Sequence, residues 1–203
     1  MGIKERREKE QEDLRQKILD AASELFAKEG YSNVSMRKIA QKIEYSPTTI
    51  YLYFKDKTDL LNQICDETFL KLIKDIEKIE TSFYEPISCL RKGMRTYVDF
   101  GLKYPNHYEI TFITPISDYL GEDHHPYEGS SGQKAFEHIV QMVTDSMKAS
   151  QIKRGDVATI SQTLWAGIHG VTSLLIAHKD FPFVEKDALI DNTIETLIKG
   201  LQH

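Results

Sequence analysis

The sequence contains few of the features that mark secreted, membrane or metal-binding proteins. Only two of its 203 residues are cysteine and only six are proline. No apolar run approaches the roughly 20 residues that span a bilayer, and residues 1–11 lack the apolar stretch of a secretory signal. We therefore expect a cytoplasmic protein with reduced cysteines, and a content of 40% hydrophobic and 28% charged residues fits a globular chain.

Signatures of catalysis are also missing. The sequence shows no nucleophile–base constellation and no paired-carboxylate motif. The Gly-Ser-Ser-Gly run at 129–132 follows no strand and lacks the Gly-Lys-Ser/Thr ending of a phosphate loop. No convincing period-2 strand appears, whereas apolar residues recur at helical spacing through most of the chain. We expect an all-α fold of about nine helices, with no catalytic residues and no cofactor.

Positive residues are outnumbered by negative ones overall, 26 against 31, but are concentrated near the N-terminus. The formal net charge is −5, which by itself argues against a nucleic-acid partner. Residues 1–57, however, carry 12 Lys+Arg against 10 Asp+Glu, and residues 37–57 carry five cations against two anions. An acidic body with a mildly basic tip is compatible with DNA binding of moderate strength and clear salt dependence.

The most informative segment is residues 35–57, which reads SMRKIAQKIEYSPTTIYLYFKDK. One apolar stripe at helical spacing comprises Met36, Ile39, Ala40 and Ile43. Ser35 can cap the N-terminus of this short helix, because a serine side chain accepts a bond from a free first-turn N–H. A second start signal follows at Ser46-Pro47, where proline takes the first helical position. Two short helices joined by a tight turn are the layout of a helix-turn-helix.

The second short helix, residues 47–54, places Ile50 and Phe54 inward. Its outer face is formed by Pro47, Thr48, Thr49, Tyr51 and Tyr53. Hydroxyl groups can contact phosphates and base edges, and Lys55 and Lys57 follow at the start of the next helix, where N–H groups also attract phosphate. The alternative interpretation of this spacing is a helical hairpin with a purely structural role.

The same residues resemble the DNA-binding domain of the tetracycline-repressor (TetR/AcrR) family. The similarity includes Gly30-Tyr31, Ser35 to Ala40, Ser46, Thr49, Ile50, Tyr51, Phe54, Lys57, Leu60 and Leu61. The family usually has glycine where this chain has Glu44, a position that favours positive φ. The resemblance implies a three-helix DNA-binding domain at residues 1–56 and a helical effector-binding and dimerisation domain at residues 57–203. The implied DNA-contacting residues are Ser35, Arg37, Ser46, Pro47, Thr48, Thr49, Tyr51, Tyr53, Lys55 and Lys57.

A weaker resemblance lies in the C-terminal part. Residues 165–170, WAGIHG, are similar to the Trp-His-Gly signature of one type of C-terminal domain in this family. The last two apolar helices, near residues 157–176 and 189–201, are expected to form the homodimer interface. A dimer would read two half-sites of a palindromic operator on double-stranded DNA, about one helical turn apart.

Aromatic residues of the body are candidates for a binding cavity. The candidate effector site comprises Tyr97, Phe100, Tyr104, Tyr108, Phe112, Phe136, Trp165 and His169. An apolar pocket with few polar anchors is typical of small-molecule sites, but each of these residues also fits an ordinary core. His169 has the same two interpretations, as a ligand anchor or as a buried structural histidine.

Two further groups favour the structural interpretation. His124-His125, in the polar loop expected over residues 114–132, is a poor metal site, because adjacent residues rarely coordinate one ion together, and we expect no metal. Cys65 and Cys89 lie among apolar residues of helical patterns, so packing is favoured over redox sensing.

Taken with the resemblance, the sequence predicts a DNA-binding transcriptional regulator that acts as a homodimer. A repressor is favoured, released from DNA by a small, largely apolar effector. One alternative is an enzyme or ligand carrier whose helical head does not touch DNA. Another is a TetR-like protein that requires a protein partner for DNA binding.

Overall fold

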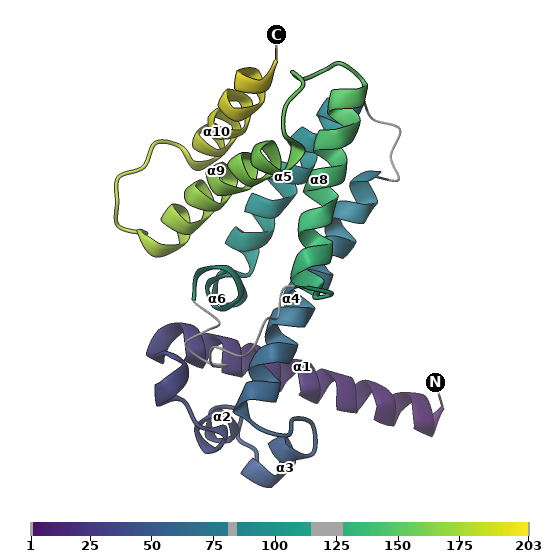
Figure 1. Cartoon of the computed structure of the whole chain (residues 1–203). Coiled ribbons are helices and arrows are strands. Elements are labelled where there is room, and N and C mark those ends of the chain that lie inside the picture. Colours follow the sequence, from purple (N-terminus) through teal and green to yellow (C-terminus); the bar gives the residue numbers. More distant parts are fainter. Residues whose placement is uncertain (1, 81–84, 115–127, 203) are drawn as a thin grey trace. The chain divides into compact units, whose positions relative to one another are not determined.

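The computed structural model describes residues 2–80, 85–114 and 128–202. Within these ranges the protein is all-α and contains no strand (Figure 1). The helices are α1 (Ile3–Glu29), α2 (Met36–Lys42), α3 (Pro47–Tyr51), α4 (Lys57–Glu80), α5 (Pro86–Lys103), α6 (Pro105–Tyr108), α8 (Ser131–Lys148), α9 (Val157–Ala177) and α10 (Lys186–Leu201). A 3₁₀ turn, Tyr31–Asn33, and a π-helical turn, Glu109–Ile113, complete the described structure.

Most helix ends lie where the sequence predicts them. Helix α1 ends at Glu29, and Gly30 caps it with a φ of 79°, which glycine adopts at little cost. Proline opens α3, α5 and α6. One expectation was wrong in extent: the second short helix closes at Tyr51 instead of Phe54. Helix α1 begins at Ile3, so most of the N-terminal segment is helical.

The chain divides into two compact units, which are described separately. The first, called the head here, comprises the described residues of Met1–Thr68 and Asn106–His125. The second, called the body, comprises those of Phe69–Pro105 and Pro126–His203. The boundary expected after residue 56 therefore does not coincide with this division, because the first turns of α4 belong to the head.

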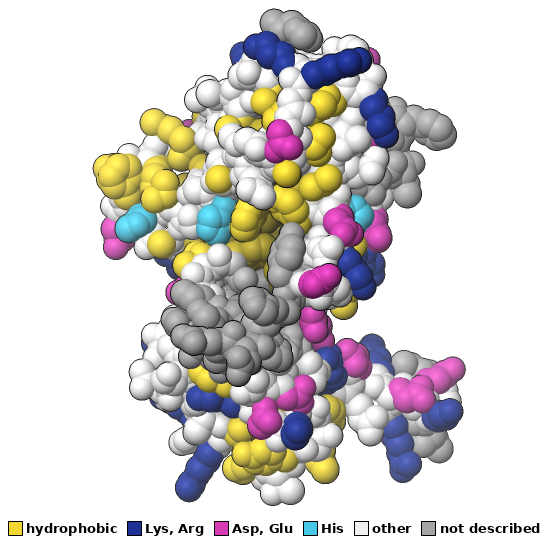
Figure 2. Space-filling view, in the orientation of Figure 1, with side chains coloured by type: hydrophobic (Ala, Val, Ile, Leu, Met, Phe, Trp, Pro, Cys, Tyr) yellow, Lys and Arg dark blue, Asp and Glu magenta, His cyan; other side chains and the backbone are white. Residues whose placement is uncertain are grey.

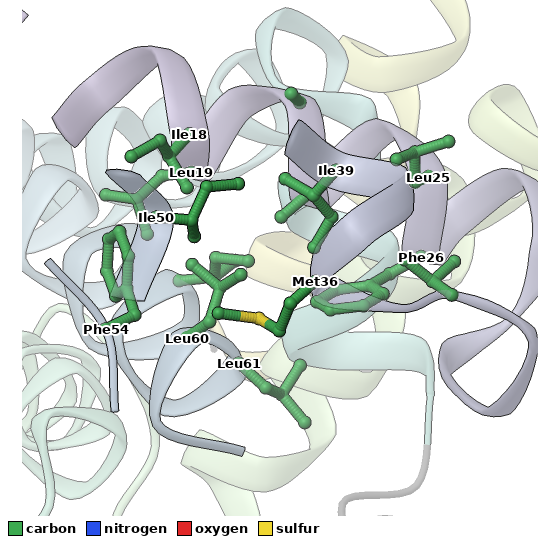
Figure 3. Close-up of a cluster of buried hydrophobic side chains, with 14 of the residues drawn as sticks. Ile18, Leu19, Leu25, Phe26, Met36, Ile39, Ile50, Phe54, Leu60 and Leu61 are labelled. Carbon is green, nitrogen blue, oxygen red and sulfur yellow. The ribbon is translucent and has the colours of Figure 1, made fainter. Parts of the chain in front are cut away.

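The head has its own hydrophobic core, shown in Figure 3. Helix α1 contributes Ile18, Leu19, Ala22 and Phe26, and α2 contributes Met36 and Ile39. Ile50 and Phe54 lie inward beside Leu60 of α4, as their spacing predicts. Ile110, which is more than 45 residues further along the chain, joins the same cluster. Burial of this apolar surface fixes the short helices α2 and α3, which are too short to be stable alone.

The body is a helical assembly around α5. Helix α5 packs against α8, α9 and α10, and α9 packs against both α8 and α10. Charged residues fasten α5 to α10: Arg91 pairs with Glu195, and Arg95 reaches Asp191 at 2.8 Å and Asp187 at 2.6 Å. Helices α9 and α10 approach closely at Gly167, where an added Cβ would lie 2.5 Å from a methyl group of Leu197.

Candidate functional site

Helix α2 begins and ends with hydrogen-bonded caps. At its start, the Ser35 hydroxyl accepts a bond from the Lys38 N–H at 3.2 Å, as expected from the sequence. At its end, the Tyr45 N–H bonds to the Ala40 carbonyl at 3.0 Å and the Glu44 N–H bonds to the Gln41 carbonyl at 3.2 Å. This pair of bonds is a Schellman motif, and Glu44 occupies its left-handed position with a φ of 62°. The turn geometry that favours glycine is therefore kept with a glutamate.

Glycine at position 44 should stabilise the head. A residue with a Cβ in the left-handed region costs about 1–2 kcal/mol, and glycine avoids this cost. Part of the gain is lost because unfolded glycine has a greater backbone entropy. We expect Glu44→Gly to raise the free energy of unfolding by about 1 kcal/mol in urea titrations followed by circular dichroism. Glu44→Ala is the control, because it removes the carboxylate and keeps the Cβ. An equal gain in the alanine variant would show that the side chain, and not the backbone, is responsible.

Helix α3 presents a polar and aromatic face. The Ser46 hydroxyl accepts a bond from the Thr49 N–H at 3.1 Å and lies 2.9 Å from the Thr49 hydroxyl, so these two candidate DNA contacts also form the cap. Pro47 and Thr48 are exposed, and Tyr51 is 54% exposed. Thr49 and Tyr53 are half-buried. The helix therefore offers side chains of the predicted kind to a partner, while Ile50 holds it in the core.

The structure distributes the cations of the head unevenly. Lys38 pairs with Glu29, and Lys42 lies 2.8 Å from Glu24. Arg37 and Lys55 are exposed, and within the described parts of the chain neither side chain has an ion pair. Of the five cations at residues 37–57, Arg37 and Lys55 are thus the two that are exposed without an ion pair among the described residues, one before and one after α3.

Lys57 opens α4, as predicted, but its side chain turns toward the backbone of the head. The ammonium group donates to the carbonyls of Tyr31 at 2.7 Å and Val34 at 2.9 Å. It also lies 4.0 Å from the centre of the Tyr31 ring. Burial lowers the pKa of Lys57 below its ordinary value.

Sequence reasoning missed one conspicuous side chain beside α3. Leu52 is 79% exposed, directly after the last residue of α3. The inward pair Ile50 and Phe54 already indicates this exposure, because a residue midway between them points away from the core. Exposed leucine at this position adds an apolar group to the face formed by α3.

The candidate effector residues fall into three groups. In the body, the Trp165 indole donates to the Tyr97 hydroxyl at 3.1 Å, and that hydroxyl lies 3.2 Å from Nδ1 of His169. Phe136 meets Trp165 edge-on, with 6.0 Å between ring centroids. The second group, also in the body, is the pair Phe100 and Tyr104 at 5.2 Å. The third, Tyr108 and Phe112 at 4.8 Å, belongs to the head.

The Tyr97 hydroxyl links Trp165 to His169. It accepts from the Trp165 indole and lies 3.2 Å from Nδ1 of His169, where the direction of the bond depends on the histidine tautomer. Burial lowers the pKa of His169 below its ordinary value, which favours the neutral form near neutral pH. A neutral, half-buried histidine suits either role that the sequence allows, ligand anchor or structural residue.

The remaining candidates add no reactive centre to the described structure. His124 and His125 lie outside the described residues. Among those described, no group of three His, Cys, Asp or Glu residues could hold a metal ion. None of the described helices has an apolar stretch that could span a bilayer. Burial raises the pKa of Cys65 to about 11, which keeps its thiol protonated at neutral pH.

Two family profiles match the chain. Residues 18–64 match the profile described as "Bacterial regulatory proteins, tetR family". Residues 90–197 match the "Tetracyclin repressor-like, C-terminal domain". The second match alone covers more than half of the chain, and together the two matches extend over parts of both compact units.

Proteins similar to this chain include regulators named for fatty acid metabolism. The Bacillus subtilis (strain 168) fatty acid metabolism regulator protein is 26% identical over 190 residues, which are 92% of this chain and 94% of that protein. A solved structure of FadR from Bacillus subtilis in complex with stearoyl-CoA superposes with a TM-score of 0.74 at 22% identity, covering 92% of this chain and 99% of that one. A putative fatty acid metabolism regulator from Clostridium perfringens gives a TM-score of 0.76 at 20% identity, with coverages of 92% and 99%.

Proposed function

Because this chain belongs to the TetR family of transcriptional regulators, we propose that it is a repressor that binds a palindromic operator as a homodimer. The observation that carries the proposal is helix α3. It is capped at Ser46, anchored in the core through Ile50, and presents Pro47, Thr48 and Tyr51 outward. Such a face suits a helix that enters the major groove, where hydroxyls reach base edges and apolar carbons meet thymine methyl groups.

The proposed interface with operator DNA contains base-reading and phosphate-binding parts. Thr48, Thr49 and Tyr51 read bases, with Pro47 and Tyr53 at the edges of the groove. Arg37, on α2, and Lys55, after α3, neutralise phosphates, because both are exposed and neither has an ion pair among the described residues. The hydroxyl groups of Ser35 and Ser46, whose oxygens accept the cap N–H bonds, donate to phosphate oxygens of the DNA.

We propose that the dimer forms through α9 and α10. Three large apolar side chains at the end of α9 and in the following loop are exposed, namely Leu174 (48%), Phe181 (60%) and Val184 (68%). Figure 2 shows hydrophobic side chains gathered where the loop between these helices runs. Burial of such a patch in a two-fold interface removes it from water and presents two heads to the DNA.

We propose further that the effector is largely apolar and carries a long acyl chain. A relative is named a fatty acid metabolism regulator, and FadR was solved with stearoyl-CoA. The cluster of Tyr97, Phe136, Trp165 and His169 supplies apolar surface with a small number of polar groups, as ligand sites do. An effector that binds better to a body conformation incompatible with the operator releases the protein from DNA.

The test is fluorescence anisotropy with the duplex that flanks the protein's own gene, using a random duplex as the control. We expect two protomers per operator, preference over the random duplex, and affinity that falls as salt increases. Stearoyl-CoA should lower operator affinity roughly 5- to 150-fold, the range of a coupling free energy of 1–3 kcal/mol. Coenzyme A alone and free stearate are the controls. Equal binding to both duplexes would contradict the operator, and no response to stearoyl-CoA would contradict the effector class.

A further inference from the structure

Two lysines from outside helix α2 bind backbone carbonyls at its two ends. Lys57, from α4, donates to the carbonyls of Tyr31 and Val34, just before α2 begins. Lys17, from α1, donates to the carbonyl of Ile43, the C-cap of α2, at 3.3 Å. Each ammonium group also faces an aromatic ring next to those carbonyls: Tyr31 at 4.0 Å for Lys57 and Tyr45 at 5.2 Å for Lys17.

These contacts provide hydrogen-bond donors to backbone carbonyls at the two ends of α2. Tyr31 to Val34 connect α1 to α2, and the Tyr31 carbonyl also accepts the Val34 N–H at 3.2 Å. Ile43 is the C-cap of α2, so its carbonyl lies beyond the hydrogen bonds of the helix. A cation is attracted both to such carbonyls and to the face of an aromatic ring. Because bonds from a charged donor are stronger than neutral ones, the two lysines hold α2 on its neighbours.

Lys57 makes shorter hydrogen bonds than Lys17, and the Tyr31 side chain next to it makes further contacts with α1 and α4. The Tyr31 hydroxyl lies 3.0 Å from the Thr58 hydroxyl, the next residue of α4. The Tyr31 ring also packs on Phe26 of α1, with 5.4 Å between centroids. The connection between α1 and α2 is therefore hydrogen-bonded to Lys57 and Thr58, the first two residues of α4. Helix α3 follows α2 after a single turn.

We propose that Lys57 is a positioning residue for the recognition helix and not a ligand of DNA phosphate, and that Lys17 has the same role at the other end of α2. Two of the three N–H groups of Lys57 are directed to carbonyls, and the Tyr31 ring faces the ammonium group. Phosphate contacts are left to Arg37 and Lys55. This inference rests on the proposed operator binding and specifies how the head achieves it.

The test compares Lys57→Met with Lys55→Met, which lies two residues earlier and carries an exposed side chain. Both variants lose one positive charge, so their net charges match. Operator and random-duplex affinities are measured by anisotropy over a salt series, at a temperature where circular dichroism shows each variant fully folded. Lys55→Met should weaken binding to both duplexes and reduce the salt slope by about 0.9 for each phosphate that is no longer neutralised.

Lys57→Met should behave differently. We expect its operator affinity to fall about tenfold, the factor of a 1.4 kcal/mol change, with random-duplex affinity and salt slope as in the wild type. Tyr31→Leu, which keeps the charge of Lys57 and removes the ring beneath it, should show the same pattern. Lys17→Met should show it more weakly, because its contacts are longer.

The outcomes separate the possible roles. A reduced salt slope for Lys57→Met, with Tyr31→Leu unchanged, would overturn the inference in favour of a phosphate ligand. Unchanged operator affinity in folded Lys57→Met and Tyr31→Leu would also overturn it, because a role in stability alone does not alter the binding of folded protein. If Lys57→Met does not fold, Tyr31→Leu decides between these outcomes. Failure of the wild type itself to prefer the operator would instead contradict the proposed function.

Discussion

Replacing Tyr51 by alanine is expected to reduce operator affinity by roughly 30- to 1,000-fold without affecting the fold. The side chain is 54% exposed on α3, so its removal creates no cavity. A good interaction with a base edge contributes about 1–3 kcal/mol. A tyrosine belongs in the lower part of this range, about 1–2 kcal/mol, because a bidentate pair defines the upper part. Its removal from both half-sites of a two-fold symmetric dimer gives about 2–4 kcal/mol, which corresponds to the stated range. Anisotropy with the operator and with a random duplex measures the effect.

Graded variants define what Tyr51 contributes. Tyr51→Phe keeps the ring and removes the hydroxyl, so it separates hydrogen bonding from apolar contact. Leu70→Ala, which removes an exposed apolar side chain (53% exposed) outside the head, is the control. Random-duplex affinity and the melting temperature should be unchanged in all three proteins. Retention of full operator affinity by Tyr51→Ala would remove α3 from the role of recognition helix.

Replacing Phe54 by alanine is expected to have the largest effect on stability. Phe54 is 1% exposed and packs in the head core with Ile50 and Leu60, and the Arg15 guanidinium lies 5.7 Å from its ring centre. A buried phenylalanine replaced by alanine costs about 3–5 kcal/mol through reduced apolar burial and the cavity left behind. Because a whole domain is stable by only about 5–15 kcal/mol, the head should melt at a much lower temperature and lose operator binding.

Leu52→Ala is the matched control for Phe54→Ala. The two positions are two residues apart, but Leu52 is 79% exposed, and exposed substitutions usually change stability by no more than about 0.5 kcal/mol. Urea titrations followed by circular dichroism measure both variants. A similar decrease of stability in the two proteins would contradict the assignment of Phe54 to the core and of Leu52 to the surface.

Local signals in the sequence account for most of the secondary structure and identify the helix-turn-helix of the head. Ser35, Ser46-Pro47 and Gly30 mark helix ends because capping depends on groups within a few residues of one another. The spacing of Ile50 and Phe54 determines which face of α3 is inward. At position 44 the resemblance implies glycine, and the glutamate of this chain leaves the turn conformation open; only the structure shows a φ of 62° there. The domain boundaries, the dimer interface and the DNA-contacting residues remain predictions.

The partners of charged and aromatic side chains were decided by tertiary structure alone. The position of Lys57 at the start of a helix predicts a phosphate contact, whereas only the structure shows that its ammonium group donates to carbonyls 23 and 26 residues away. Periodicity identified Tyr97 and Trp165 as body aromatics, and only the packing of α5 against α9 joins them through one hydrogen bond. Ile110 completes the core of a head whose other core residues lie more than 40 residues earlier. The physical reason is that a sequence pattern specifies which face of a helix is apolar, whereas the partner that covers the face depends on how distant segments pack.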